Sequence, residues 1–153
     1  MNQDHPQVVT FPPALFALGL LVGGLLQWLR PVPIPGPGWL TWLGPPAVAL
    51  GVALAIWARR RMSAAGTDPN PFRATTAIVA SGPYRVTRNP MYVAMAIAFV
   101  GIALWTRAAI LLAMLVPVVL VLHFGIVRRE EGYLEVKFGD VYRDYRRRVR
   151  RYL

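Results

Sequence analysis

The segment 81–92, with the sequence SGPYRVTRNPMY, holds residue types that are suited to binding an anion. Arg85 and Arg88 supply positive charge, and Asn89 followed by Pro90 is typical of a helix start, because proline at the first helical position loses no hydrogen bond. Exposed backbone amides at a helix start attract negative groups. The segment therefore predicts a pocket for a carboxylate or a phosphate. The alternative is a helix cap whose basic flanks hold phospholipid headgroups.

A second group of ionisable residues lies between His123 and Glu131. At helical spacing His123, Val127 and Glu130 share one face, and Glu131 lies beside it. Ionisable groups this close to hydrocarbon usually face the interior of a helix bundle. Adjacent carboxylates can hydrogen-bond ribose hydroxyls or balance an ammonium or sulfonium cation. The alternative is that both glutamates pair with the arginines directly before them or with other arginines at the interface.

Together, the two groups resemble the isoprenylcysteine carboxyl methyltransferase and phospholipid methyltransferase superfamily of integral membrane methyltransferases. That pattern combines Gly-Pro-Tyr, an Arg-His/Asn-Pro-x-Tyr signature before a membrane helix, a Glu-Glu pair, and a downstream Phe-Gly-x-x-Tyr-x-x-Tyr. The matching stretches in this chain are residues 82–84, 88–92, 130–131 and 138–145. Their joint order and spacing, over roughly half of the chain, are more specific than any one motif alone.

The resemblance implies an enzyme that uses S-adenosylmethionine to methylate a lipid-like or prenylated small substrate, which enters sideways from the bilayer. It also implies that the cofactor pocket forms where the third and fourth membrane helices meet the loop and the tail. The cofactor-binding residues that it predicts are Gly82, Pro83, Tyr84, Arg88, Asn89, Pro90, Tyr92, His123, Glu130 and Glu131. The predicted catalytic residues are Arg88, Glu130 and Glu131. No metal site is predicted, and the absence of cysteine excludes thiolate chemistry.

Two positions depart from the family pattern. Asn89 stands in place of the commoner histidine, and Ala94 stands where a glycine often follows the signature tyrosine. Asparagine donates and accepts hydrogen bonds but does not titrate near neutral pH, so we expect no general base at this position. Two other functions compete with the methyltransferase. One is a sterol-reductase-like enzyme that binds NADPH, for which the chain is short, and the other is a non-enzymatic membrane adaptor that binds anionic lipid or a partner protein.

Four uncharged runs provide the membrane helices that must position these residues. A helix rises about 1.5 Å per residue and needs roughly 20 residues to cross the hydrocarbon. The predicted spans are residues 11–30, 39–59, 90–106 and 108–127, and the last two form a hairpin with a tight turn at Arg107. A backbone in lipid must satisfy its own hydrogen bonds, and the sequence lacks the two-residue alternation of a membrane barrel. The predicted fold is therefore all-α.

The distribution of charge predicts the orientation. The chain of 153 residues is 56% hydrophobic and has a net charge of +10, yet all lysines and arginines except Arg30 and Arg107 lie between residues 59 and 88 or from residue 128 onward. A soluble nucleic-acid binder would spread such residues over its surface, so no nucleic-acid partner is expected. The positive-inside rule predicts one membrane domain, residues 1–153, with the loop 60–89, the tail 128–153 and both termini in the cytoplasm. The arginine-rich and lysine-poor composition favours a prokaryotic inner membrane.

The tail is predicted to be helical and amphipathic. Its apolar and aromatic residues recur at spacings of three and four, and they are Leu134, Phe138, Val141, Tyr142, Tyr145 and Val149. Gly139 followed by Asp140 predicts a helix stop and a new helix start. The tail is thus expected to form two helical pieces folded under the membrane domain.

Small residues and prolines predict where the spans approach each other and where they bend. Ala47 and Gly51 lie at four-residue spacing in the second span and allow a neighbouring helix to come close. Pro45, Pro46 and Pro117 are predicted to bend their helices.

Overall fold

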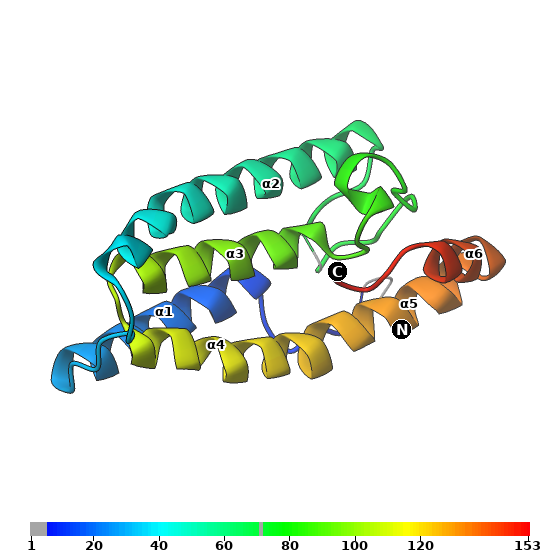
Figure 1. The fold of residues 1–153 in the computed structure, drawn as a ribbon. Helices are drawn as coiled ribbons and strands as arrows, with labels where there is room; N and C mark the ends of the chain where they lie inside the picture. Colours follow the sequence, from blue (N-terminus) through cyan, green and yellow to red (C-terminus); the bar gives the residue numbers. More distant parts are fainter. Residues whose placement is uncertain (1–5, 71) are drawn as a thin grey trace.

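A computed structural model describes residues 6–70 and 72–153, and this part of the chain is all-α, with 71% of residues in helices and no strand. Figure 1 shows an elongated bundle of long, roughly parallel helices that is extended at one end by two shorter helices. Three described helical segments, Pro12–Leu29, Gly38–Ala64 and Ala109–Phe138, are long and apolar enough to cross a membrane, and Pro90–Trp105 is a shorter apolar helix. The predicted fold class, an all-α integral membrane protein, is confirmed.

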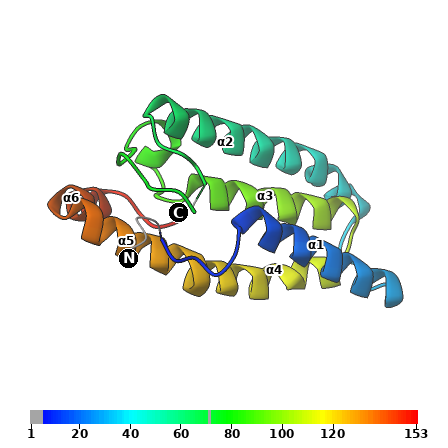
Figure 2. The same ribbon diagram turned by 180° about the vertical axis from the view of Figure 1, so that it is seen from behind.

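The bundle consists of α1 (Pro12–Leu29), α2 (Gly44–Ala64), α3 (Pro90–Trp105) and α4 (Ala109–Leu122), followed by α5 (Arg128–Phe138) and α6 (Asp140–Arg148). Short 3-10 helices, η1 (Gly38–Leu43) and η2 (Gly82–Arg85), precede α2 and α3, and a π-helical segment, η3 (His123–Val127), joins α4 to α5. The two views in Figures 1 and 2 show that α2 packs along α3 and that α1 lies beside α4.

The second predicted span, residues 39–59, lies within the apolar helical segment Gly38–Ala64, in which the 3-10 helix η1 precedes an α-helix that starts at Gly44. Pro45 and Pro46 lie in the first turn of α2, where backbone N–H groups need no partner within the helix. They start the helix instead of bending it, which corrects the predicted bend. Pro117 lies inside α4, and its bend remains a prediction.

The turns lie where the sequence places them. Arg107 has a φ of 53° between α3 and α4, and its guanidinium donates hydrogen bonds to the carbonyl oxygens of Ile34 and Gly36 at 2.8 and 2.9 Å. This contact ties the α3–α4 turn to the α1–α2 connector. Gly139 has a φ of 54° between α5 and α6, which is the conformation that favours glycine. The predicted division of the tail at this residue is confirmed.

The close approach of α2 to α3 depends on Gly51. A Cβ atom at this position would lie 2.6 Å from the carbonyl oxygen of Ala94 and 2.9 Å from the Cβ of Ala98. We expect Gly51→Leu to force the two helices apart and to cost about 1–3 kcal/mol, the usual effect of overpacking. Thermal unfolding in detergent, followed by tryptophan fluorescence, should show a Tm several degrees lower.

The matched control is Gly24→Leu in α1, because no atom lies within 4 Å of a Cβ built there. Its Tm should stay close to that of the unmodified chain. Equal Tm values for the two variants would show that α2 and α3 do not need the small residue.

Candidate functional site

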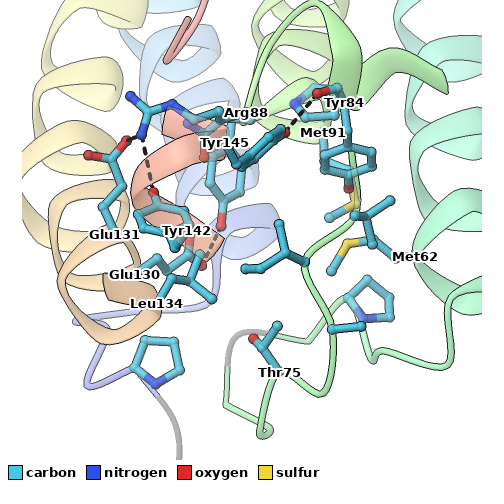
Figure 3. Close-up of a pocket in the computed structure, with 18 of the residues that line it drawn as sticks. Met62, Thr75, Tyr84, Arg88, Met91, Glu130, Glu131, Leu134, Tyr142 and Tyr145 are labelled. Atoms are coloured by element: carbon cyan, nitrogen blue, oxygen red, sulfur yellow. Dashed lines mark hydrogen bonds and ion pairs between the residues drawn. The ribbon is translucent and has the colours of Figure 1, made fainter. Parts of the chain in front are cut away.

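One cavity lies at the end of the bundle that carries α5 and α6 (Figure 3). The space inside it is about 830 Å³, a figure that includes open solvent at its mouth. Most of the site residues predicted from the sequence line it, namely Tyr84, Arg88, Asn89, Pro90, Tyr92, Glu130 and Glu131. The segment before α3 and the glutamate pair of α5 are therefore brought together, although they are about forty residues apart in the chain.

A short pairing with the end of the chain holds the segment before α3 in place. The backbone N–H of Arg88 donates to the carbonyl oxygen of Arg150 at 2.9 Å. The Thr87 hydroxyl and the Asn89 side-chain amide both donate to the carbonyl oxygen of Arg151, at 3.0 and 2.9 Å. The amide of Asn89 thus binds the C-terminal segment, and this bond fixes the start of α3 against the residues that follow α6.

Glu131 lies at the centre of a buried ion-pair network. Its side chain is 9% exposed, and Arg88, 8% exposed, places Nη1 at 3.0 Å from Glu131 Oε1. Arg151 adds a bidentate pair, with Nε at 2.9 Å from Oε1 and Nη2 at 2.8 Å from Oε2. Arg88 also donates from Nη1 to the hydroxyl of Tyr142 at 3.1 Å, as drawn in Figure 3. Two guanidinium groups therefore balance the charge of Glu131.

Glu130 has a different environment. It is half-buried in the cavity wall and accepts a hydrogen bond from the Tyr92 hydroxyl at 2.7 Å. Among the described residues, no guanidinium or ammonium group forms an ion pair with it. The arginines before the glutamates have other contacts, since Arg128 lies over the ring of Phe124 and Arg129 donates to the carbonyl oxygen of Gln7. Pairing with interfacial arginines thus applies to Glu131 and not to Glu130.

Two buried polar atoms in the cavity wall have no hydrogen-bond partner among the described residues. They are Nε of Arg88 and the hydroxyl of Tyr84. A buried donor without a partner costs about 1–3 kcal/mol, so each of these atoms needs a hydrogen-bond acceptor that the described residues do not supply. Burial, with the nearby Tyr145 and Glu130, raises the pKa of Tyr84 well above its usual value. The phenol therefore stays neutral and keeps its proton as a donor.

The remaining predicted residues are not among the described residues that line the cavity. Gly82, with a φ of 59°, and Pro83 form the turn that leads into η2 and orients Tyr84. His123 has its Nδ1 at 2.9 Å from the hydroxyl of Tyr152, outside the cavity lining. The structure therefore groups Tyr84, Arg88, Tyr92 and the glutamates, but it does not bring His123 to them.

The structure also identifies residues that the sequence prediction of the site missed. Tyr142 and Tyr145 of α6 are 1% and 6% exposed and line the cavity, and the Tyr145 hydroxyl donates to the carbonyl oxygen of Tyr84 at 2.7 Å. Their positions in the amphipathic stripe and in the Tyr-x-x-Tyr motif were the signal for this role. Asp68 and Asn70, in the loop after α2, also line the cavity, and no motif marks them.

Comparison with known proteins shows the family. The model of the phospholipid methyltransferase family matches residues 39–141. An uncharacterized protein from Haemophilus influenzae is 36% identical over 63 residues, which are 41% of this chain and all of that protein. The nickel-cobalt-cadmium resistance protein NccN from Alcaligenes xylosoxydans xylosoxydans is 31% identical over 77 residues, 50% of this chain but 36% of that protein. Since the family model matches well over half of the chain, the predicted resemblance is confirmed, and the chain belongs to the phospholipid methyltransferase family of membrane methyltransferases that act on lipid-like substrates.

Proposed function

We propose that this protein binds S-adenosylmethionine in the cavity of Figure 3 and methylates a lipid-like acceptor at the cytoplasmic face of the membrane. One observation carries the proposal. Among the described residues, Glu130 is a carboxylate without a cationic partner, and it shares one cavity with two buried donors that also lack a partner, Arg88 Nε and the Tyr84 hydroxyl. A ligand that completes the site carries a positive group for Glu130 and hydrogen-bond acceptors, such as a carboxylate, for the two donors.

The residues present fit S-adenosylmethionine, which carries a sulfonium cation, an amino-acid end with ammonium and carboxylate groups, and a flat aromatic adenine ring. Arg88 Nε and the Tyr84 hydroxyl would donate to the carboxylate, since charge-assisted hydrogen bonds from a guanidinium are the stronger kind. Glu130 would balance the positive sulfur. Met62, Met91 and Leu134 give the wall apolar surface against which the adenine can pack. Membership of a methyltransferase family supports the same methyl donor.

S-adenosylmethionine supplies a methyl group that is already activated for in-line displacement. The protein has to align the acceptor and exclude water, and Tyr84, Tyr92, Tyr142 and Tyr145 provide a buried wall for this purpose. A carboxylate acceptor needs no further help. An amine acceptor must lose a proton, and Glu130, held by the Tyr92 hydroxyl, is the side chain in the cavity that is placed to accept it.

The charge distribution supports a cytoplasmic site. The cavity lies at the bundle end that carries α5 and α6, where the arginines of the tail are concentrated. Arg30 and Arg107 follow the helix ends at the opposite side of the bundle. By the positive-inside rule, the end with the cavity faces the cytoplasm.

The proposal is tested by calorimetric titration of the full-length protein in detergent with S-adenosylmethionine, S-adenosylhomocysteine and NADPH. We expect the first two to bind, because both carry the carboxylate and the nucleoside, and we expect NADPH not to bind. Binding of NADPH alone would favour the reductase alternative. Binding of none of the three would contradict the proposed site.

A further inference from the structure

The loop that follows α2 forms a second polar side of the cavity. Its residues Asp68, Asn70 and Thr75 line the cavity, and Figure 3 shows Thr75 across the cavity from Glu130. Asp68 is the one acidic residue in the sequence between the end of α2 and the start of η2. The cavity thus receives a carboxylate from this loop in addition to the two glutamates of α5.

Hydrogen bonds within the loop hold Asp68 in place. The backbone N–H of Thr76 donates to Thr67 Oγ1 at 3.0 Å, and Thr76 Oγ1 donates to the carbonyl oxygen of Gly66 at 2.8 Å. Thr67 is 2% exposed, and its backbone N–H donates to the carbonyl oxygen of Met62 in α2 at 3.2 Å. The loop is therefore closed at its base and attached to α2, so Asp68, directly after Thr67, is positioned before a ligand binds.

The carboxylate of Asp68 keeps hydrogen-bond capacity for a ligand. Its Oδ1 accepts the backbone N–H of Asn70 at 2.9 Å, and its Oδ2 lies 3.1 Å from Nη1 of Arg73. An ionised carboxylate has about four lone-pair sites, so about two remain. The side chain of Arg73 is 70% exposed, and Arg73 is not among the described residues that line the cavity. Arg73 therefore holds Asp68 from the solvent side, and the remaining acceptor sites are available to a ligand in the cavity.

The ribose is the part of S-adenosylmethionine that fits these acceptor sites. It has two neighbouring hydroxyl groups, and an acidic side chain is also the acceptor for a ribose hydroxyl in dinucleotide-binding folds. The proposed contacts place the sulfur at Glu130 and the adenine against Met62. Because the ribose joins the adenine to the sulfur, and because the loop is attached at Met62, its hydroxyls are the polar groups of the cofactor nearest to Asp68.

We infer that Asp68 binds the ribose of S-adenosylmethionine by accepting hydrogen bonds from the 2′- and 3′-hydroxyl groups. The inference rests on the proposed function, because it assigns a further residue to the cavity proposed for this cofactor. Asp68 then makes the site selective for a ribonucleoside, since a ligand without these hydroxyls leaves the carboxylate without its partners. S-adenosylhomocysteine has the same ribose, so its binding measures the contact independently of methyl transfer.

The test is calorimetric titration of the full-length protein in detergent with S-adenosylhomocysteine and with its 2′,3′-dideoxy analogue. We expect the unmodified protein to bind the analogue about tenfold more weakly, the effect of losing hydrogen bonds to a charged group. Asp68→Asn keeps an oxygen for the N–H of Asn70 but removes the charge. It should bind S-adenosylhomocysteine about tenfold more weakly and the analogue as well as the unmodified protein does. Equal binding of the two ligands by the unmodified protein would overturn the inference, whether or not the variant folds.

The matched control is Arg73→Gln, which removes the same ion pair from outside the cavity lining. It should bind S-adenosylhomocysteine as the unmodified protein does. Equal losses of affinity in the two variants would mean that Asp68 only holds the loop, and an equal loss for both ligands in Asp68→Asn would mean that Asp68 contacts another part of the cofactor. Either result would overturn the inference and leave the proposed function intact, whereas no binding of S-adenosylhomocysteine by the unmodified protein would contradict both.

Discussion

Replacement of Arg88 by lysine is expected to weaken binding of S-adenosylmethionine by roughly 10- to 100-fold, the effect of losing a hydrogen bond to a charged group. Lysine keeps a positive charge opposite Glu131, so the buried ion pair survives in part. It has no Nε–H, however, and that atom of Arg88 is the buried donor without a partner among the described residues. Calorimetry measures the loss of affinity, and transfer of a labelled methyl group measures the loss of activity.

The matched control is Arg151→Lys. Arg88 and Arg151 both pair with Glu131, but only Arg88 is among the described residues that line the cavity. Both lysine variants should lower the Tm to a similar degree, because each weakens the same buried network. Only Arg88→Lys should lose affinity for S-adenosylmethionine. Equal losses of affinity in the two variants would mean that Arg88 acts only by holding Glu131.

The fold could be predicted because its signals are local. The length of an uncharged run sets a membrane span, and Gly139 ends α5 because its positive φ favours glycine. The prolines at the start of α2 show the limit of local reasoning. A proline bends a helix only when the helix has already begun, and the sequence does not show that α2 begins at Gly44.

The position of His123 could not be predicted, and the reason is the register of one helix. His123 and Glu130 are seven residues apart, which places them on one face of a regular α-helix. The π-helical segment His123–Val127 lies between them and has wider turns, so the α-helical register is not kept. As a result, Glu130 lines the polar cavity, whereas His123 meets Tyr152 outside its lining.

Arg151 was missed for another reason. It belongs to the arginine-rich run at the end of the chain, whose members have nearly the same local surroundings in the sequence. Only the pairing of the last residues with the segment before α3 brings its guanidinium to Glu131. The motifs that contain Tyr84, Arg88 and Tyr92 are short and have a specific spacing, so these residues could be predicted. A run of similar residues has no such spacing that would single out one of its members.

Replacement of Glu130 by glutamine is expected to lower kcat/KM for methyl transfer by roughly 100-fold, a loss similar to that of other preorganised charged groups in active sites. The variant keeps the shape of the side chain and an oxygen that accepts the Tyr92 hydrogen bond. It removes the negative charge of Glu130, which is the one cavity carboxylate without a guanidinium partner among the described residues. The Tm should therefore stay close to that of the unmodified chain while activity falls.

The contrast with Glu131→Gln makes this prediction specific. Glu131 balances Arg88 and Arg151, so its neutralisation leaves two guanidinium groups without their anion. Breaking a buried pair costs about 3–5 kcal/mol, and we expect a clear fall in Tm for Glu131→Gln that Glu130→Gln does not show. A membrane adaptor without catalytic function would show neither methyl transfer nor cofactor binding, in the unmodified chain or in either variant. If Glu130→Gln binds S-adenosylmethionine and transfers the methyl group as well as the unmodified chain, Glu130 is not the group that balances the sulfonium, and the proposed arrangement of the site is wrong.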